Sequence, residues 1–286
     1  MNAIVQTGAR EAATLDLTPD ATWAARHRMA WRDLCEATLL WRLCAKLSWL
    51  DIKLRYRGSM LGPFWLTLST AVMVAAMGGI YATLFRMNLH EYLPFLVLSL
   101  VLWGYVGSLV TEACTGFTQA EGMIRSVRMP YTLYAVRIVL RNVLVLAHNI
   151  VVIVAVFALL DTWPGLSGLL AFPAFALWLV DSLALAVLLG ALCARYRDIP
   201  PIVGSMMQMA FFVTPVIWKP ELVGADRAWL LPFNPFFSLL EVVRAPLLGV
   251  VPSVANYASA VGYSLLLCGF TWVLFARVRG RIAFWV

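Results

Sequence analysis

Apolar stretches about twenty residues long recur along this chain of 286 residues. A helix needs about 20 consecutive apolar residues to cross the hydrocarbon core of a bilayer. Stretches near this length occupy residues 64–85, 92–117, 138–160, 169–194, 202–218 and 257–276. Hydrophobic residues make up 62% of the chain and charged residues only 13%, in contrast to globular domains. The sequence therefore predicts an all-α integral membrane protein with six transmembrane helices.

A seventh apolar region, residues 229–251, contains prolines at 232, 235 and 246 together with Glu241 and Arg244. Proline frees backbone carbonyl groups, and hydrocarbon offers no water to satisfy them. We therefore interpret this region as short re-entrant or interfacial helices placed before the last span.

The connections between spans differ sharply in positive charge. Loops that stay in the cytoplasm carry an excess of Lys and Arg. Of the 22 Lys and Arg residues, 18 precede the first span, lie in the second-to-third or fourth-to-fifth connection, or follow the last span. This bias predicts that both termini are cytoplasmic. A net charge of +7 is thus explained by topology and anionic lipid, and we expect no nucleic-acid partner.

The segment before the first span has the pattern of an amphipathic helix. Leucines recur at steps of three and four from Leu40 to Leu54, whereas Arg42, Lys46 and Lys53 lie off that stripe. Such a helix lies in the membrane interface, docks on a partner, or does both. We predict an interface helix over residues 31–57, preceded by a mobile cytoplasmic tail over residues 1–30.

The sequence lacks the usual signatures of catalysis and nucleotide binding. It has no G-x-x-x-x-G-K-[ST] loop, no HExxH and no GxSxG motif. The doublet His90–Glu91 has no third group near it in sequence, and no metal-ligand spacing occurs. We therefore expect a transport subunit that is not an enzyme and carries no cofactor or metal. Energy would come from ATP and Mg²⁺ on a separate subunit.

Four ionisable residues fall inside the predicted spans, where charge is costly and therefore informative. They are Glu112, Arg141, His148 and Asp181. Either acid could pair with Arg137 or Arg141, as a structural ion pair or as part of a transport path. Arg141 and His148 are seven residues apart, which places them on neighbouring parts of one helical face that should look inward or toward a second subunit.

Several stretches together carry a family resemblance. They are LRYRGSMLGPFWLTLS (54–69), the run from EYLPFLVLSL to YTLYAVR (91–137), ARYRDIPPIVGSMMQMAFFVTPVIW (194–218), LPFNPFFSLLEVVRAPLLG (231–249) and RGRIAFW (279–285). Their order and spacing resemble ABC-2 type permeases that export lipid-linked polysaccharides: O-antigen, capsule and teichoic acid. The similarity is greatest to the O-antigen exporters and covers residues 30–286.

The resemblance implies a homodimer, with each subunit seated on its own cytoplasmic ABC ATPase, in the bacterial inner membrane. The cargo would be an undecaprenyl-pyrophosphate-linked polysaccharide. A coupling helix that contacts the ATPase would match residues 119–131, with Glu121, Arg125 and Arg128 on one helical face and Pro130 at its end. External gate helices would match residues 221–251, with Phe233, Asn234 and Pro235 as gate residues.

A glycan channel needs aromatic rings for the C–H faces of sugars and polar groups for their hydroxyls. Candidate channel residues are Trp65, Tyr81, Phe85, Trp103, Gln208, Phe211, Phe212 and Trp218. Some of these aromatics could instead belong to the interfacial belt. We favour the first and fifth spans, because their aromatics are accompanied by Ser, Thr and Gln.

Arg55 and Arg57 are candidates for the entrance of the lipid pyrophosphate, or alternatively for anchoring to anionic lipid. Two other functions stay open at this point. One is an ABC-2 permease for capsule, teichoic acid, another lipid or a drug. The other, from a different class, is a membrane glycosyl- or acyltransferase.

Overall fold

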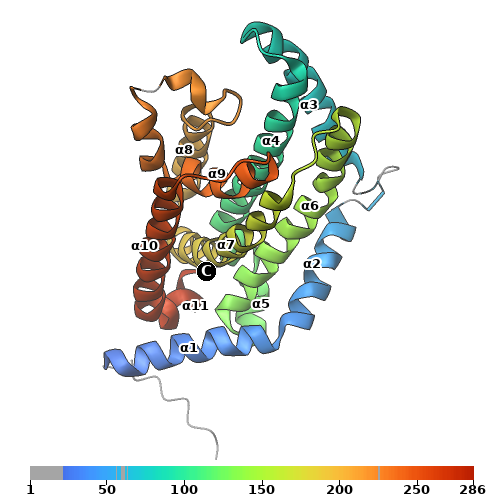
Figure 1. Ribbon diagram of the computed structural model, residues 1–286. Helices are drawn as coiled ribbons and strands as arrows, with labels where there is room; N and C mark the ends of the chain where they lie inside the picture. The colour runs from blue at the N-terminus through green and yellow to red at the C-terminus, as the bar shows by residue number, and fades with distance from the viewer. Residues whose placement is uncertain (1–21, 56, 59–61, 63, 225) are drawn as a thin grey trace, which may run out of the picture.

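The structure is a computed structural model that describes residues 22–55, 57–58, 62, 64–224 and 226–286. These residues form helices and connecting turns, without a strand among them (Figure 1). The elements are α1 (Trp23–Leu39), α2 (Trp41–Arg55), α3 (Phe64–Leu84), α4 (Leu89–Gln119), α5 (Glu121–Ser126), α6 (Tyr131–Leu160), η1 (Leu166–Leu170), α7 (Ala171–Arg195), α8 (Ile199–Val213), η2 (Pro220–Val223), η3 (Ala228–Phe233), α9 (Pro235–Leu247), α10 (Val254–Val278), η4 (Arg279–Arg281) and α11 (Ile282–Trp285). The predicted all-α class is confirmed.

Five stretches of the described chain are long and apolar enough to cross a membrane: α3, α4 with α5, α6, η1 with α7, and α10 through α11. The sixth predicted span, residues 202–218, differs. There α8 has only 15 residues, about 22 Å of helix against a hydrocarbon thickness of about 30 Å. The helix stops because Thr214 precedes Pro215, and a residue before proline is driven into the extended conformation that Thr214 adopts.

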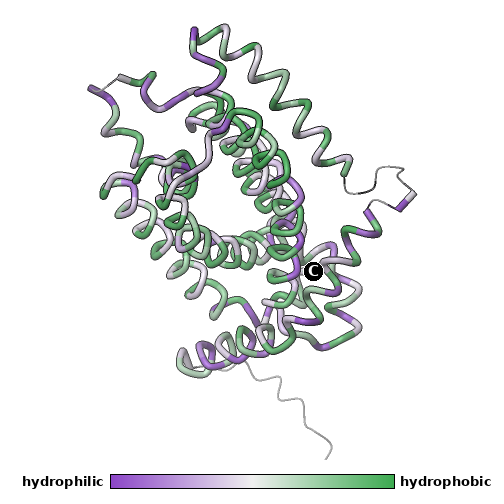
Figure 2. Tube along the Cα trace, turned by 45° about the vertical axis from the view of Figure 1, so that its right-hand side comes forward, coloured by the Kyte–Doolittle hydropathy of each residue, from purple (hydrophilic) through white to green (hydrophobic). Residues whose placement is uncertain are grey.

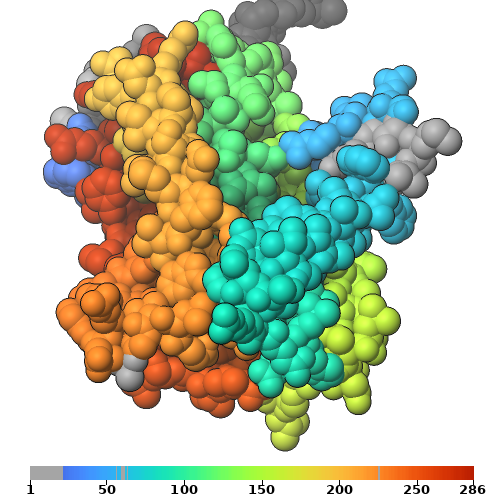
Figure 3. All heavy atoms as spheres, turned by 90° about the horizontal axis from the view of Figure 1, so that it is seen from above, coloured from blue at the N-terminus to red at the C-terminus, as the bar shows by residue number. Residues whose placement is uncertain are grey.

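The centre of the bundle is α4, which packs between α6 and α7 (Figure 1). In its most apolar window 67% of residues are buried, whereas the corresponding value for α3 is 11%. A close approach of α4 to α7 depends on Gly190, because an added Cβ there would stand 3.2 Å from the Phe117 ring. In the space-filling view α3 projects away from the body of the molecule (Figure 3).

The predicted single interface helix is two helices, which meet at Leu40. One of them, α1, crosses the end of the bundle that also carries α5 and α11, and α2 runs beside α6 (Figure 1). Asp33 of α1 and Asp51 of α2 both bind α6, and their partners on α6 lie about eight residues apart, about 12 Å along that helix. If α1 and α2 were one unbroken helix, Asp33 and Asp51 would be about 27 Å apart. The break brings both acids to α6.

The tail predicted for residues 1–30 falls partly on residues 1–21, which lie outside the described part of the chain. Residues 23–30 are already helical, so the predicted boundary is wrong there. Only the later part of the α2 leucine stripe faces outward: Leu50 and Leu54 are exposed, whereas Leu43 is half-buried against the core. The side chains of Cys44, Ser48 and Ile52 pack against the bundle. Hydrophilic residues are concentrated in α1, in α2 and at the ends of the long helices (Figure 2).

The proline-rich region before α10 contains η2, η3 and α9, each too short to span, with residue 225 outside the description. Within it Arg244 is fully buried. Its guanidinium group pairs with Glu241, donates to the Ser99 hydroxyl (2.8 Å) and to the Pro215 carbonyl (2.6 Å), and lies 4.3 Å from the centroid of the Phe95 ring. This buried arginine ties α9 to α4 and to the turn that follows α8.

Candidate functional site

Over the second half of α4 one face is polar and at least partly exposed. Its residues follow each other at steps of one and three, and none is buried: Gly104, Gly107, Ser108, Thr111, Glu112, Thr115 and Thr118. We call this set the α4 strip. The opposite face, including Leu109 and Phe117, is buried in the bundle. Because a charged and hydroxylated face is costly against lipid, the α4 strip is suited to face a water-filled space or another protein surface.

The α4 strip borders a hollow of about 450 Å³ between α4 and α8, which we call the α4–α8 groove. The Trp103 ring lies 5.8 Å from Phe211 and 5.5 Å from Phe236, measured between ring centroids. Residues lining the groove include Trp103, Gly107, Thr111, Gln208, Phe211 and Phe212. Four of the eight candidate channel residues are thus brought to one place.

The other four candidates lie elsewhere. Tyr81 and Phe85 stack on each other at 5.6 Å, and Phe85 meets Tyr92 edge-on, so both take part in packing α3 on α4. Trp65 is exposed on α3. Trp218 donates from its indole N–H to the Phe212 carbonyl (3.0 Å), just beyond the end of α8. The groove is therefore walled by α4 and α8, and α3 lines no part of it.

A cluster of charged side chains lies farther along α4 and joins it to α2 and α6. Glu112 accepts hydrogen bonds from Arg55 (2.8 Å), Arg141 (2.8 Å) and the Asn142 amide (2.7 Å). Asp51 accepts from Arg137 (2.5 Å) and Arg141 (3.2 Å). We call Arg55, Arg137, Arg141, Asp51 and Glu112 the arginine cluster. The pairing of Glu112 with Arg141 confirms a predicted option.

Sequence reasoning missed Asp51, although its position beside Ile52, at helical spacing from Ser48 and Cys44, places it near the packed face of α2. Its two arginine partners hold α2 against α6. Three guanidinium groups face two carboxylates, so the arginine cluster retains a net positive charge. Arg57 lies beyond the end of α2 and is exposed.

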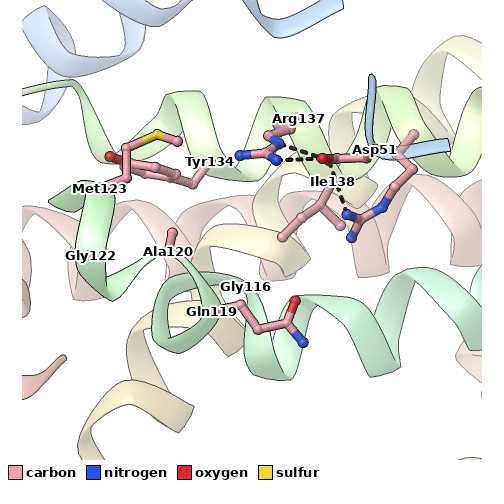
Figure 4. A pocket seen from close by; sticks show the side chains of 10 residues that line it. Asp51, Gly116, Gln119, Ala120, Gly122, Met123, Tyr134, Arg137 and Ile138 are labelled. Carbon is pink, nitrogen blue, oxygen red and sulfur yellow. Dashed lines mark hydrogen bonds and ion pairs between the residues drawn. The ribbon is translucent and has the colours of Figure 1, made fainter. Parts of the chain in front are cut away.

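Beside the arginine cluster is a pocket of about 380 Å³, bounded by α2, the end of α4, α5 and α6 (Figure 4). Gln119, Tyr134, Arg137 and Arg141 line it, and dashed lines in Figure 4 connect Arg137 to Asp51. Arg141 binds the same carboxylate. The buried Tyr134 hydroxyl has no hydrogen-bond partner among the described residues. Guanidinium groups and a free hydroxyl donor are suited to phosphate or carboxylate oxygens.

The predicted coupling helix over residues 119–131 is shorter than expected. Helix α5 ends at Ser126, and the chain is extended before Pro130, which precedes the first residue of α6. Glu121 and Arg125 form an ion pair across one turn at 2.9 Å, but Arg128 lies outside the helix. The shared helical face expected for all three is therefore wrong for Arg128. Arg125 also donates to the main-chain oxygen of Val286 (2.5 Å).

The three predicted gate residues lie at the start of α9. The Asn234 side chain caps that helix by accepting from the Phe236 and Phe237 amides, and its own amide donates to the Thr214 hydroxyl (3.0 Å). Pro235 is the first residue of α9, a position that suits its missing N–H. Phe233 is exposed. Asn234 thus joins the end of α8 to the beginning of α9.

Asp181 and His148 stand apart from the arginine cluster. Asp181 accepts a hydrogen bond from Ser264 (2.7 Å) and has no ion pair within the described ranges, so the suggested pairing with Arg137 or Arg141 is wrong for this acid. The His148 ring bonds the Leu144 carbonyl of its own helix (2.7 Å). Of the two residues predicted to share a face of α6, Arg141 reaches the arginine cluster and His148 does not.

A second structural acid was also missed. Asp33 of α1 is fully buried and accepts from the amides of Tyr131 and Thr132 (3.2 and 2.9 Å), which begin α6. It also accepts from the Thr132 hydroxyl (2.7 Å) and from Arg279 (2.8 Å). One carboxylate therefore caps α6 and links both ends of the described chain.

Three known proteins are similar to this chain in sequence. An O-antigen export system permease protein of Myxococcus xanthus is 25% identical over 198 residues, 68% of this chain and 76% of the relative. Two such proteins of Klebsiella pneumoniae are 22% identical, one over 191 residues (66% of this chain, 74% of the relative) and one over 237 residues (82% and 90%). No protein-family model matches the chain. These relatives confirm the resemblance found in the sequence.

Proposed function

On the basis of this similarity to the permeases of O-antigen export systems, we propose that the chain is the membrane-spanning subunit of an ABC exporter of the bacterial inner membrane. It moves an undecaprenyl-pyrophosphate-linked polysaccharide, an O-antigen, to the outer leaflet. The ATP and Mg²⁺ that drive export are bound by a separate cytoplasmic ATPase.

The structural observation that supports the proposed cargo is the α4 strip together with the α4–α8 groove. A sugar chain presents C–H faces, which stack on aromatic rings, and hydroxyls, which need polar partners. The groove offers the rings of Trp103, Phe211 and Phe212 beside the polar side chains of Thr111 and Gln208. Many weak contacts of this kind hold a polymer in place and still let it slide.

A single copy does not enclose the groove, because its walls are α4 and α8 alone and α8 has no buried residue. A second copy that covers the α4 strip completes the channel and removes polar surface from lipid. In this homodimer each subunit contributes one wall of the channel. Six spans per subunit also require that α8, together with the turn that follows it, crosses the membrane to the outer side.

The end of the bundle that carries α1, α5 and α11 is the cytoplasmic end in this proposal. Most Lys and Arg residues belong to the segments at that end, which fits the positive-inside rule. Both termini are then cytoplasmic. Helix α5, with the ion pair of Glu121 and Arg125, contacts the ATPase. At the opposite end η2, η3 and α9 form the external gate, with Asn234 as the joint to α8.

The net positive arginine cluster lies between the cytoplasmic end and the groove, along α4. It attracts the pyrophosphate of the lipid carrier, and Arg55 and Arg57 form the outer part of this entrance. Arg55 is half-exposed even while it binds Glu112, so it can meet an incoming headgroup.

Co-expression with the ATPase of the same export system tests the assignment. We expect the two proteins to co-purify, and we expect Glu121→Ala with Arg125→Ala to weaken that complex. The matched control is Arg32→Ala with Glu36→Ala, which removes another exposed ion pair one helical turn apart. If a strain without the chain still displays O-antigen, or if the ATPase never co-purifies, the proposed function is wrong.

A further inference from the structure

Asp181 is a buried acid that nothing in the proposed transport path uses. Its side chain lies on α7, only 7% of the residue is exposed, and Ser264 of α10 donates to one carboxyl oxygen. The other oxygen, Oδ1, has no hydrogen-bond partner among the described residues. Whether ionised or protonated, the carboxyl group leaves one polar atom unsatisfied, which is costly in an apolar interior.

The carboxyl group borders a cavity of about 400 Å³ that is otherwise apolar. Five helices surround this cavity: α4, α7, α8, α9 and α10. Its walls include Leu185, Val203, Met206, Ala210 and Leu267. Asp181 also lines a smaller cavity of about 80 Å³. The larger volume lies within the range of small-molecule sites, about 300–1,000 Å³.

The other polar groups of the cavity are already engaged. The Tyr263 hydroxyl donates to the Phe233 carbonyl (2.7 Å), and the Ser264 hydroxyl donates to Asp181 itself (2.7 Å). In the smaller cavity the Tyr105 hydroxyl bonds Ser182 (2.8 Å). Asp181 is therefore the one polar anchor that a guest would find among the described residues of the wall. A guest that fits must combine a hydrocarbon body with a single cationic or donor group.

We propose that this cavity binds a lipophilic amine, whose ammonium group pairs with Asp181 while its hydrocarbon body fills the space behind α8. The ammonium group supplies both the missing charge and the missing N–H donors. Met207 of α8 lines this cavity and also the α4–α8 groove, so the two spaces share one wall. A bound amine therefore supports α8, a helix that has no buried residue of its own.

The experiment uses the full chain in phospholipid nanodiscs and a primary alkylamine that carries a photoreactive diazirine. A second probe has the same chain and diazirine but ends in a methyl group. After illumination, peptide mass spectrometry locates the labels. We expect the amine to label the segments around Met206 and Leu267, and an excess of unlabelled alkylamine to suppress that labelling. The methyl-terminated probe should label these segments much less than the lipid-facing side of α3.

Two variants separate charge from space. Asp181→Asn keeps the shape and removes the charge, and we expect it to lower amine labelling about tenfold, equivalent to about 1.4 kcal/mol. Ala210→Leu keeps the charge and fills the cavity from α8, and we expect a similar loss. The proposal is overturned if labelling by the amine resists competition, if both probes label alike, or if neither variant changes the labelling. Export of O-antigen by the unaltered chain is scored separately, so failure of this site leaves the proposed function standing.

Discussion

The arginine cluster joins three helices through two carboxylates, and Glu112 is the carboxylate with the most partners. The change Glu112→Gln keeps the size of the side chain and removes its charge. In the unaltered chain Glu112 binds Arg55, Arg141 and Asn142, and only 16% of its side chain is exposed. The variant leaves Arg141 with Asp51 as its remaining carboxylate partner.

The expected cost follows from these contacts. A hydrogen bond to a charged group contributes about 1.5–3 kcal/mol, and breaking a buried ion pair costs about 3–5 kcal/mol. Because Arg55 is half-exposed, its share is worth less than about 1 kcal/mol. The glutamine retains part of the bonding, so we expect a loss of about 2–4 kcal/mol. For a chain of this size that corresponds to a fall in Tm of about 4–8 °C.

The assay is thermal unfolding of the detergent-purified protein. The measured quantity at each temperature is the fraction that stays monodisperse in gel filtration. Arg141→Met should lower Tm as much as Glu112→Gln, and the double variant should lose less than the sum of the two. Arg55→Met is the matched control and should lower Tm by no more than about 2 °C. The reasoning is refuted if Glu112→Gln is neutral, or if Arg55→Met costs as much as Arg141→Met.

Three further predictions concern the groove, the cap of α6 and a buried thiol. Phe211→Ala should reduce surface O-antigen several-fold on immunoblots without loss of the ATPase complex. The control is Phe270→Ala, which changes an exposed aromatic residue of α10 outside the groove and should leave surface O-antigen unchanged. Equal export by both variants would contradict the groove assignment. Asp33→Ala should lower the free energy of unfolding by about 2–4 kcal/mol, because it removes the cap of α6 and the carboxylate partner of Arg279. A Tm within about 2 °C of the unaltered chain would contradict this structural role of Asp33. Burial raises the pKa of the Cys44 thiol, so at pH 8 a smaller fraction of it is thiolate than for an ordinary cysteine. A maleimide should therefore modify the buried Cys44 more slowly than the half-buried Cys35, as measured by peptide mass spectrometry. Faster modification of Cys44 would contradict its burial.

The sequence by itself determined which segments form the long helices of the bundle. The long helices follow runs of apolar residues, because hydrocarbon solvates no backbone polar group and each run must satisfy its own bonds as helix. The region from residue 229 to 251 is irregular for the same reason, because its prolines and charges forbid a lipid-facing span. The pairing of Glu112 with Arg141 was one of the options that the sequence left open, because charge inside a span is costly without a partner, and packing selected it.

The tertiary structure decided everything that depends on which faces meet. Hydropathy could not show that α2 leaves Leu50 and Leu54 exposed and packs Cys44 and Ser48 against α6. It also could not show that Asp33 reaches Arg279 across 246 positions of sequence. It also could not choose α4 over α3 as the wall of the groove. Within spans that are apolar throughout, the periodicity of hydrophobic residues is weak, and the face that each helix presents is set by packing against distant segments.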